Sequence, residues 1–208
     1  MEMPTSNQEV AVIPDKFKGL LEILKSKLDM DLSESAGVQR IISEDVKWSR
    51  GPSFSILPYG LELGGVTPSP ILNAEPKNKK NCFKFYCSER YGFYRSDIYG
   101  VDSTVIETEI YQVEGQSTYS IRFDDDENAI RASGVIFENG VPNISCRVED
   151  DGEYCCYEYR YEAATITSMI VYASNSAPGT EIFIERNGEN VVGLYFCSKD
   201  SRIYIYKV

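Results

Sequence analysis

Histidine is missing from all 208 residues of the chain. This side chain is the usual general base near neutral pH and a common ligand of transition metals. Its absence excludes Ser-His-Asp and Cys-His catalysis, and it also excludes zinc sites that mix cysteine with histidine. We therefore predict a protein that is not an enzyme. Paired carboxylates and a lysine base are the routes to catalysis that the composition leaves open.

The C-x-x-C motif is missing as well from the spacing of the six cysteines. On a strand, the adjacent Cys155 and Cys156 point to opposite faces, as do Cys82 and Cys87. We expect no metal site and no cofactor, and we expect reduced, mostly buried thiols. The six are Cys82, Cys87, Cys146, Cys155, Cys156 and Cys197.

Long hydrophobic runs are absent too. No segment approaches the roughly 18 apolar residues of a membrane span. The polar residues 1–8 lack the features of a signal peptide. These observations predict a cytoplasmic protein that does not enter a membrane.

Basic residues are in deficit, with 21 Lys and Arg against 32 Asp and Glu, so the formal net charge is −11. A negative field repels phosphate backbones and anionic lipid surfaces, so we expect neither nucleic acid nor membrane as a partner. The same field attracts a protein with a basic surface and speeds its encounter. A simpler interpretation is that the charge provides solubility.

Apolar spacing of the helical type marks the N-terminal part. Residues 15–29 predict an amphipathic helix, and residues 33–46 predict a second, short one. We expect residues 1–48 to form a tail with a helical segment, and residues 49–208 an antiparallel β domain, within a single domain overall. The apolar face of the first helix consists of Phe17, Leu20, Leu21, Leu24 and Leu28.

Proline and glycine punctuate residues 49–80, where we expect a strand over 54–63 and a long loop over 67–80. From Cys82 onward the hydrophobic period changes to two. The sequence predicts strands at 82–88, 91–99, 104–113, 117–124, 129–137, 143–149, 153–161, 164–173, 180–186, 191–197 and 202–207.

Short turns such as Asn139-Gly140 and Asn187-Gly188 separate these strands, which forces antiparallel neighbours. The predicted fold class is mainly β (α+β). It is an antiparallel meander that closes into a barrel or a two-layer sheet, with one or two N-terminal helices packed against it.

Alternation assigns faces to the strands. In 104–113, Ile106 and Ile110 are expected in the core, whereas Glu107 and Glu109 are expected to face water. Two carboxylates about 7 Å apart could serve glycoside chemistry, but nothing else in the sequence favours a sugar enzyme. Arginines in or beside strands are expected to pair with carboxylates across the sheet. They are Arg90, Arg95, Arg122, Arg131, Arg147 and Arg160.

Two acidic clusters lie at predicted turns, where the simplest interpretation is solvated carboxylates. Neither matches the ligand spacing of an EF-hand loop. An even number of hairpin legs separates them, so both turns are expected at one end of the sheet, where they form a negative patch. The residues concerned are Asp124, Asp125, Asp126, Glu149, Asp150 and Asp151.

A tyrosine stripe is the most distinctive local pattern, since Tyr157, Tyr159 and Tyr161 share one face of a strand. Such a stripe is typical of a core layer with hydroxyls at its rim, of a ligand cavity, or of an interface. Tyrosines around an internal cavity would favour a ligand binder. Tyrosines in an outward patch would favour a protein binder.

These patterns favour a non-enzymatic protein-binding module, an acidic intracellular inhibitor or immunity-type protein that neutralises a basic partner protein. Its expected contact surface is the two acidic clusters together with Tyr157, Tyr159 and Tyr161. One alternative is a β-barrel that binds an apolar small molecule or chromophore. A second alternative is a structural or assembly subunit.

Overall fold

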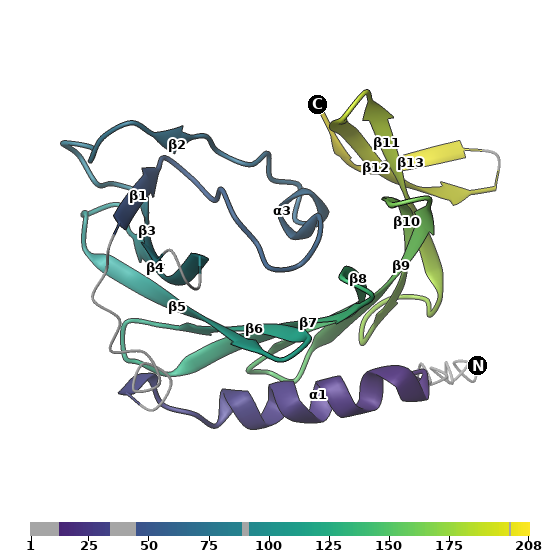
Figure 1. Ribbon diagram of the computed structural model, residues 1–208, viewed down its shortest axis with the longest axis horizontal. Helices are drawn as coiled ribbons and strands as arrows, with labels where there is room; N and C mark the ends of the chain where they lie inside the picture. Colours follow the sequence, from purple (N-terminus) through teal and green to yellow (C-terminus); the bar gives the residue numbers. More distant parts are fainter. Residues whose placement is uncertain (1–12, 34–44, 89–91, 200) are drawn as a thin grey trace, which may run out of the picture.

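A computed structural model describes residues 13–33, 45–88, 92–199 and 201–208. Its strands form one antiparallel sheet in the order β13-β12-β11-β10-β9-β8-β7-β6-β5-β4-β3-β1-β2 (Figure 1). A helix, α1 (Asp15–Leu28), precedes them. The predicted mainly β class with an antiparallel meander and a packed N-terminal helix is therefore confirmed.

The strand bounds follow the predicted period closely from Cys82 onward. They are β1 (Asp45–Ser49), β2 (Ile71–Leu72), β3 (Phe83–Ser88), β4 (Gly92–Tyr99), β5 (Val105–Glu114), β6 (Ser117–Phe123), β7 (Ala129–Glu138), β8 (Val141–Glu149), β9 (Tyr154–Glu162), β10 (Thr165–Ala173), β11 (Thr180–Asn187), β12 (Asn190–Ser198) and β13 (Ser201–Lys207).

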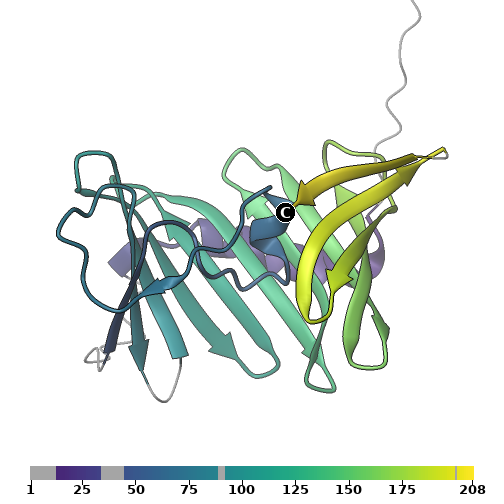
Figure 2. The same cartoon turned by 90° about the horizontal axis from the view of Figure 1, so that it is seen from above.

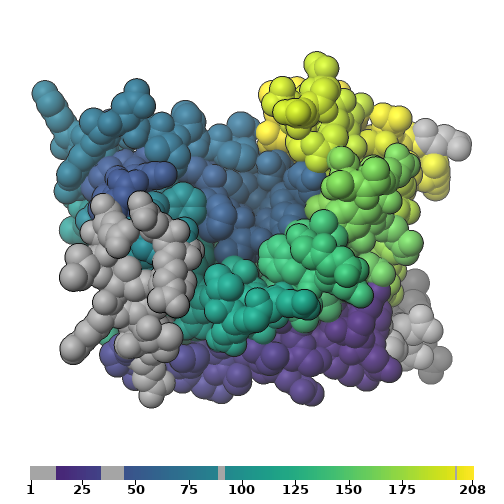
Figure 3. All heavy atoms as spheres, viewed as in Figure 1, coloured from purple at the N-terminus to yellow at the C-terminus, as the bar shows by residue number. Residues whose placement is uncertain are grey.

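The sheet curls into a trough, with α1 against its convex side and residues 50–80 on its concave side (Figures 1 and 2). Its two ends, β2 and β13, pair with no further strand among the described residues, so the trough is not closed. Atoms of residues 50–80 fill much of the space between the two arms (Figure 3).

Helix α1 docks through the apolar face that its spacing predicts. Phe17, Leu20 and Leu24 are fully or almost fully buried against β7, β8 and neighbouring strands. Gly134 lies under the helix, where an added Cβ would come within 2.9 Å of Leu20 Cδ1. The Leu20 and Leu24 side chains therefore lie directly against the sheet backbone at this point. No described helix has the length and apolarity needed to cross a membrane.

The expectation of a strand over residues 54–63 is wrong. The segment instead contains a short helix, α3 (Gly60–Leu63), preceded by Tyr59 in the left-handed region with φ of 59°. Phe54 packs on Phe93 and Tyr111 with ring centroids 5.0 and 5.5 Å away. Contacts with the concave face thus replace the strand pairing that local alternation indicated.

Two further expectations differ at the N-terminal side. The predicted loop over 67–80 contains β2, which pairs with Trp48 and Ser49 of β1. Most of the predicted second helix, residues 34–44, lies outside the described residues, and residues 45 and 46 belong to β1 instead. The sheet therefore includes residues on both sides of the boundary expected at 48/49.

Candidate functional site

The two acidic turns lie at the same end of the sheet, as their spacing predicts. The β6–β7 and β8–β9 turns are neighbours, since the Asp150 amide donates to the Ile130 carbonyl at 3.1 Å. Asp124 shapes the first turn by accepting the amides of Asp126 and Asn128 at 3.1 and 2.8 Å. We call the exposed carboxylates of these turns the acidic end: Asp125, Asp126, Glu127, Asp150, Asp151 and Glu153.

Glu149 differs from its neighbours at this end. Its carboxylate accepts from Arg131 Nε at 2.8 Å and lies 3.0 Å from Arg147 Nε. By contrast, no acidic-end carboxylate forms an ion pair with any residue of the described ranges. Five of the six acidic residues singled out in the sequence thus lie in or flank the exposed turns, whereas Glu149 points into the trough.

The tyrosine stripe lies on the concave face. Tyr157 and Tyr159 are only 6 and 5% exposed, and the Tyr159 hydroxyl shares a 2.6 Å hydrogen bond with Ser145 Oγ. The half-buried Tyr161 donates to the Pro142 carbonyl. Tyr157 and Tyr159 are therefore core residues, which removes them from the outer surface where a protein partner would dock.

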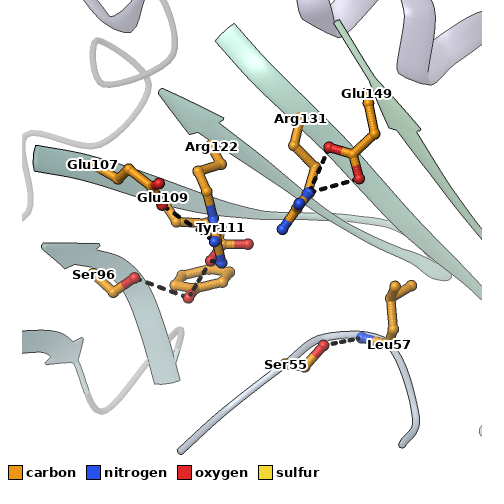
Figure 4. Close-up of polar contacts among 9 residues, drawn as sticks. All are labelled: Ser55, Leu57, Ser96, Glu107, Glu109, Tyr111, Arg122, Arg131 and Glu149. Atoms are coloured by element: carbon orange, nitrogen blue, oxygen red, sulfur yellow. Dashed lines mark hydrogen bonds and ion pairs between the residues drawn. The ribbon is translucent and has the colours of Figure 1, made fainter. Parts of the chain in front are cut away.

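An arginine–glutamate row crosses the concave face where the sequence predicted water-facing carboxylates. Arg122 donates to Glu107 at 3.2 Å and to Glu109 at 3.0 Å (Figure 4). The Glu109 side chain is 13% exposed, so the expectation that it faces water is wrong. Because Arg122 holds both carboxylates, they form an ion-pair cluster and not a free acid–base pair.

Tyr111 completes this cluster. Its hydroxyl donates to Glu109 at 3.2 Å and lies 3.1 Å from Ser96 Oγ. Burial, reinforced by the Glu109 charge, raises the pKa of Tyr111 well above its ordinary value. Burial opposes the charge on Arg122, but Glu109 and Glu107 outweigh it and raise the pKa of Arg122.

A small cavity of about 80 Å³ lies between this row and residues 54–61. Arg122, Arg131 and Arg147 line it from neighbouring strands. Ser55 and Leu57 belong to the segment opposite, which Figure 4 shows together with Arg122 and Arg131. A more open cleft of about 350 Å³ lies at the end of the strands opposite the acidic end. Its lining includes Tyr59, Pro142, Tyr161, Ile166, Arg186 and Glu189.

The cysteines are free thiols, and Cys155 and Cys197 are the two that are not buried. Cys146 and Cys156 face each other beneath α1 with 2.7 Å between their sulfur atoms, and burial raises the pKa of Cys146. Within the described residues, no group of three or more acidic or cysteine side chains is placed to hold a metal ion.

Arg122 supplies a stability test of the ion-pair cluster. We expect Arg122→Met to lower the free energy of unfolding by about 3 kcal/mol, the lower part of the range for buried pairs, because Glu107 and Glu109 lose their counter-charge. Adding Glu109→Gln should restore part of the loss. Urea denaturation measures both variants. Arg202→Met, which breaks a pair with a 56% exposed arginine, should cost below about 1 kcal/mol. Equal losses in the Arg122 and Arg202 variants would contradict the assignment.

Fold and site together define an antiparallel β protein. Its curled sheet holds residues 50–80 and the arginine–glutamate row on its concave side. Comparison with protein families, with characterised proteins and with solved structures gave no match for the chain.

Proposed function

We propose that this protein is a non-enzymatic protein-binding module of the inhibitor or immunity type, which binds a basic surface of a partner protein through its acidic end. The observation that carries the proposal is the juxtaposition of two exposed acidic turns whose carboxylates lack a basic partner among the described residues. Unneutralised charges held side by side attract and orient a basic protein before contact.

The shape of the turns supports the same function. Hydrogen bonds from Asp126, Asn128 and Glu153 amides to aspartate side chains fix the turn backbones. A fixed surface loses less conformational entropy when a partner binds. The barrel alternative has less support, because residues 50–80 occupy the concave side, where an apolar ligand would lie.

The test uses two variants that lose the same number of charges at opposite ends of the sheet. Asp125, Asp126 and Asp150 are exposed and their carboxylates make no described hydrogen bond, so all three can be changed to Asn. The control changes the exposed Glu138, Glu162 and Glu189, at the opposite turns, to Gln. Both variants carry three fewer negative charges.

We expect the wild type and the control to retain one stoichiometric basic protein from lysate of the native host, and the acidic-end variant to lose it. With the purified partner, the association rate of the acidic-end variant should fall by roughly tenfold or more, and salt should weaken wild-type binding. Equal retention by the two variants would overturn the proposed surface. Absence of any stoichiometric partner would overturn the proposed function.

A further inference from the structure

Three arginines converge on the small cavity beneath residues 54–61. Arg122, Arg131 and Arg147 belong to β6, β7 and β8, and the sheet register places Arg122 opposite Arg131 and Arg147 opposite Ser133. Ser120 and Ser133, both nearly buried, add hydroxyls to the same wall. We propose that this cavity binds a small tetrahedral oxyanion of the phosphate or sulfate type.

The cavity wall carries three guanidiniums and one carboxylate, that of Glu109. A guanidinium carries five N–H donors and no acceptor. Arg131 and Arg147 contact Glu149 through Nε, which leaves their Nη groups without an acceptor among the described residues. Arg122 Nε is buried and also has no such acceptor. Arg122 Nε has almost no accessible surface, so the donors open to an anion in the cavity are the Nη groups of Arg131 and Arg147, whose side chains are 33 and 36% exposed.

The glutamates orient the guanidiniums. Glu107 and Glu109 hold Arg122, and Glu149 holds the other two, so each arginine is anchored by a carboxylate while further N–H groups remain available. Three positive and three negative side chains compensate one another formally. The affinity for an anion must then come from directed hydrogen bonds. The net charge of −11 repels an anion only weakly, because charges more than about 8 Å away are screened in physiological salt.

Geometry selects the class of anion. A carboxylate pairs with one arginine in a planar, two-point arrangement. Donors that come from three strands around one space suit an anion that accepts from several directions. The cavity of about 80 Å³ exceeds the roughly 10–15 Å³ that one water needs, and residues 54–61 cover it. Because residues 54–61 lie across this small space, we expect it to admit the free anion and to leave too little room for an organic ester.

The experiment measures melting temperature and heat of binding with inorganic phosphate and with sulfate, against sodium chloride of equal ionic strength. Phosphate and sulfate should each raise the melting temperature of the wild type saturably, by mass action on the folded state. Ser133→Ala should weaken the apparent affinity roughly tenfold, as expected for one hydrogen bond to a charged group. Arg147→Lys should weaken it further. Arg160→Lys, at an exposed position, should leave it unchanged.

Three results would overturn the site: an equal effect of chloride, wild-type affinity in both Ser133→Ala and Arg147→Lys, or equal binding of glycerol 2-phosphate. The last result would show a site open to esters. Ser133→Ala changes a single small side chain, so it keeps the test decisive even where Arg147→Lys unfolds the protein. Anion binding is independent of the acidic end, so either proposal can fail while the other holds.

Discussion

Replacing Phe17 with alanine is expected to lower the free energy of unfolding by about 3–5 kcal/mol. The side chain is fully buried, and its ring lies 5.4 Å from that of Tyr172 of β10. Helix α1 has 14 residues, a length at which an isolated helix is marginal in water, so its stability depends on this contact with the sheet. Urea denaturation followed by circular dichroism measures the loss.

Ile23→Ala is the matched control, because Ile23 belongs to the same helix but is 40% exposed. Its effect should stay within about 0.5–1 kcal/mol. Similar losses for the two variants would mean that α1 does not dock through the face of Phe17, Leu20 and Leu24. Such a result would also leave the close approach at Gly134 without a structural role.

The meander was predictable because local signals agree with the final structure. Asn139 and Gly140 both have positive φ, 53 and 81°, which an Asn-Gly turn between two strands requires. The alternation on either side gave β7 and β8 to within two residues. The helix was predictable for the same reason, since its apolar spacing matches the face that is buried.

Residues 54–63 were not predictable in this way. Their local pattern resembles a strand, and their structure depends on residues far along the chain. Phe54 meets Phe93 and Tyr111, and the Tyr59 hydroxyl accepts from Arg186. Thr67 lies 3.3 Å, oxygen to oxygen, from the Tyr206 hydroxyl near the C-terminus. The alternation of apolar and polar residues within the segment carries no information about such distant partners.

The candidate sites were predicted in part. The even number of hairpin strands between the acidic turns correctly predicted that they lie at one end of the sheet. The expectation that strand arginines pair across the sheet is confirmed for Arg122 and Arg131. For Glu109 the predicted exposure to water was wrong, although it lies on the strand face opposite Ile110 as expected. An alternating strand identifies two faces, but here both are covered, one by α1 and the other by residues 50–80. A single covered face was assumed, so the carboxylates were assigned to water.

Alkaline pH is expected to unfold the protein steeply, because burial raises the pKa of Tyr111, Tyr157 and Tyr159. An unfolded tyrosine titrates near pH 10. Above that pH the unfolded chain releases protons that the folded chain retains, so the free energy of unfolding falls as pH rises. Below pH 10 the contribution is fully present. Each tyrosine contributes a slope of about 1.4 kcal/mol per pH unit, and three give about 4 kcal/mol per unit.

Folded proteins typically have a free energy of unfolding of about 5–15 kcal/mol. At this slope it would fall to zero within roughly one to four pH units above pH 10. Circular dichroism should therefore show a cooperative loss of strand signal. This loss should coincide with the appearance of phenolate absorbance from Tyr111, Tyr157 and Tyr159. Tyr159→Phe should reduce the slope by about 1.4 kcal/mol per pH unit, since one buried phenol no longer titrates. If all fifteen tyrosines instead titrate together near pH 10 while the strand signal is unchanged, the phenols of the concave face are open to water and the described core is wrong.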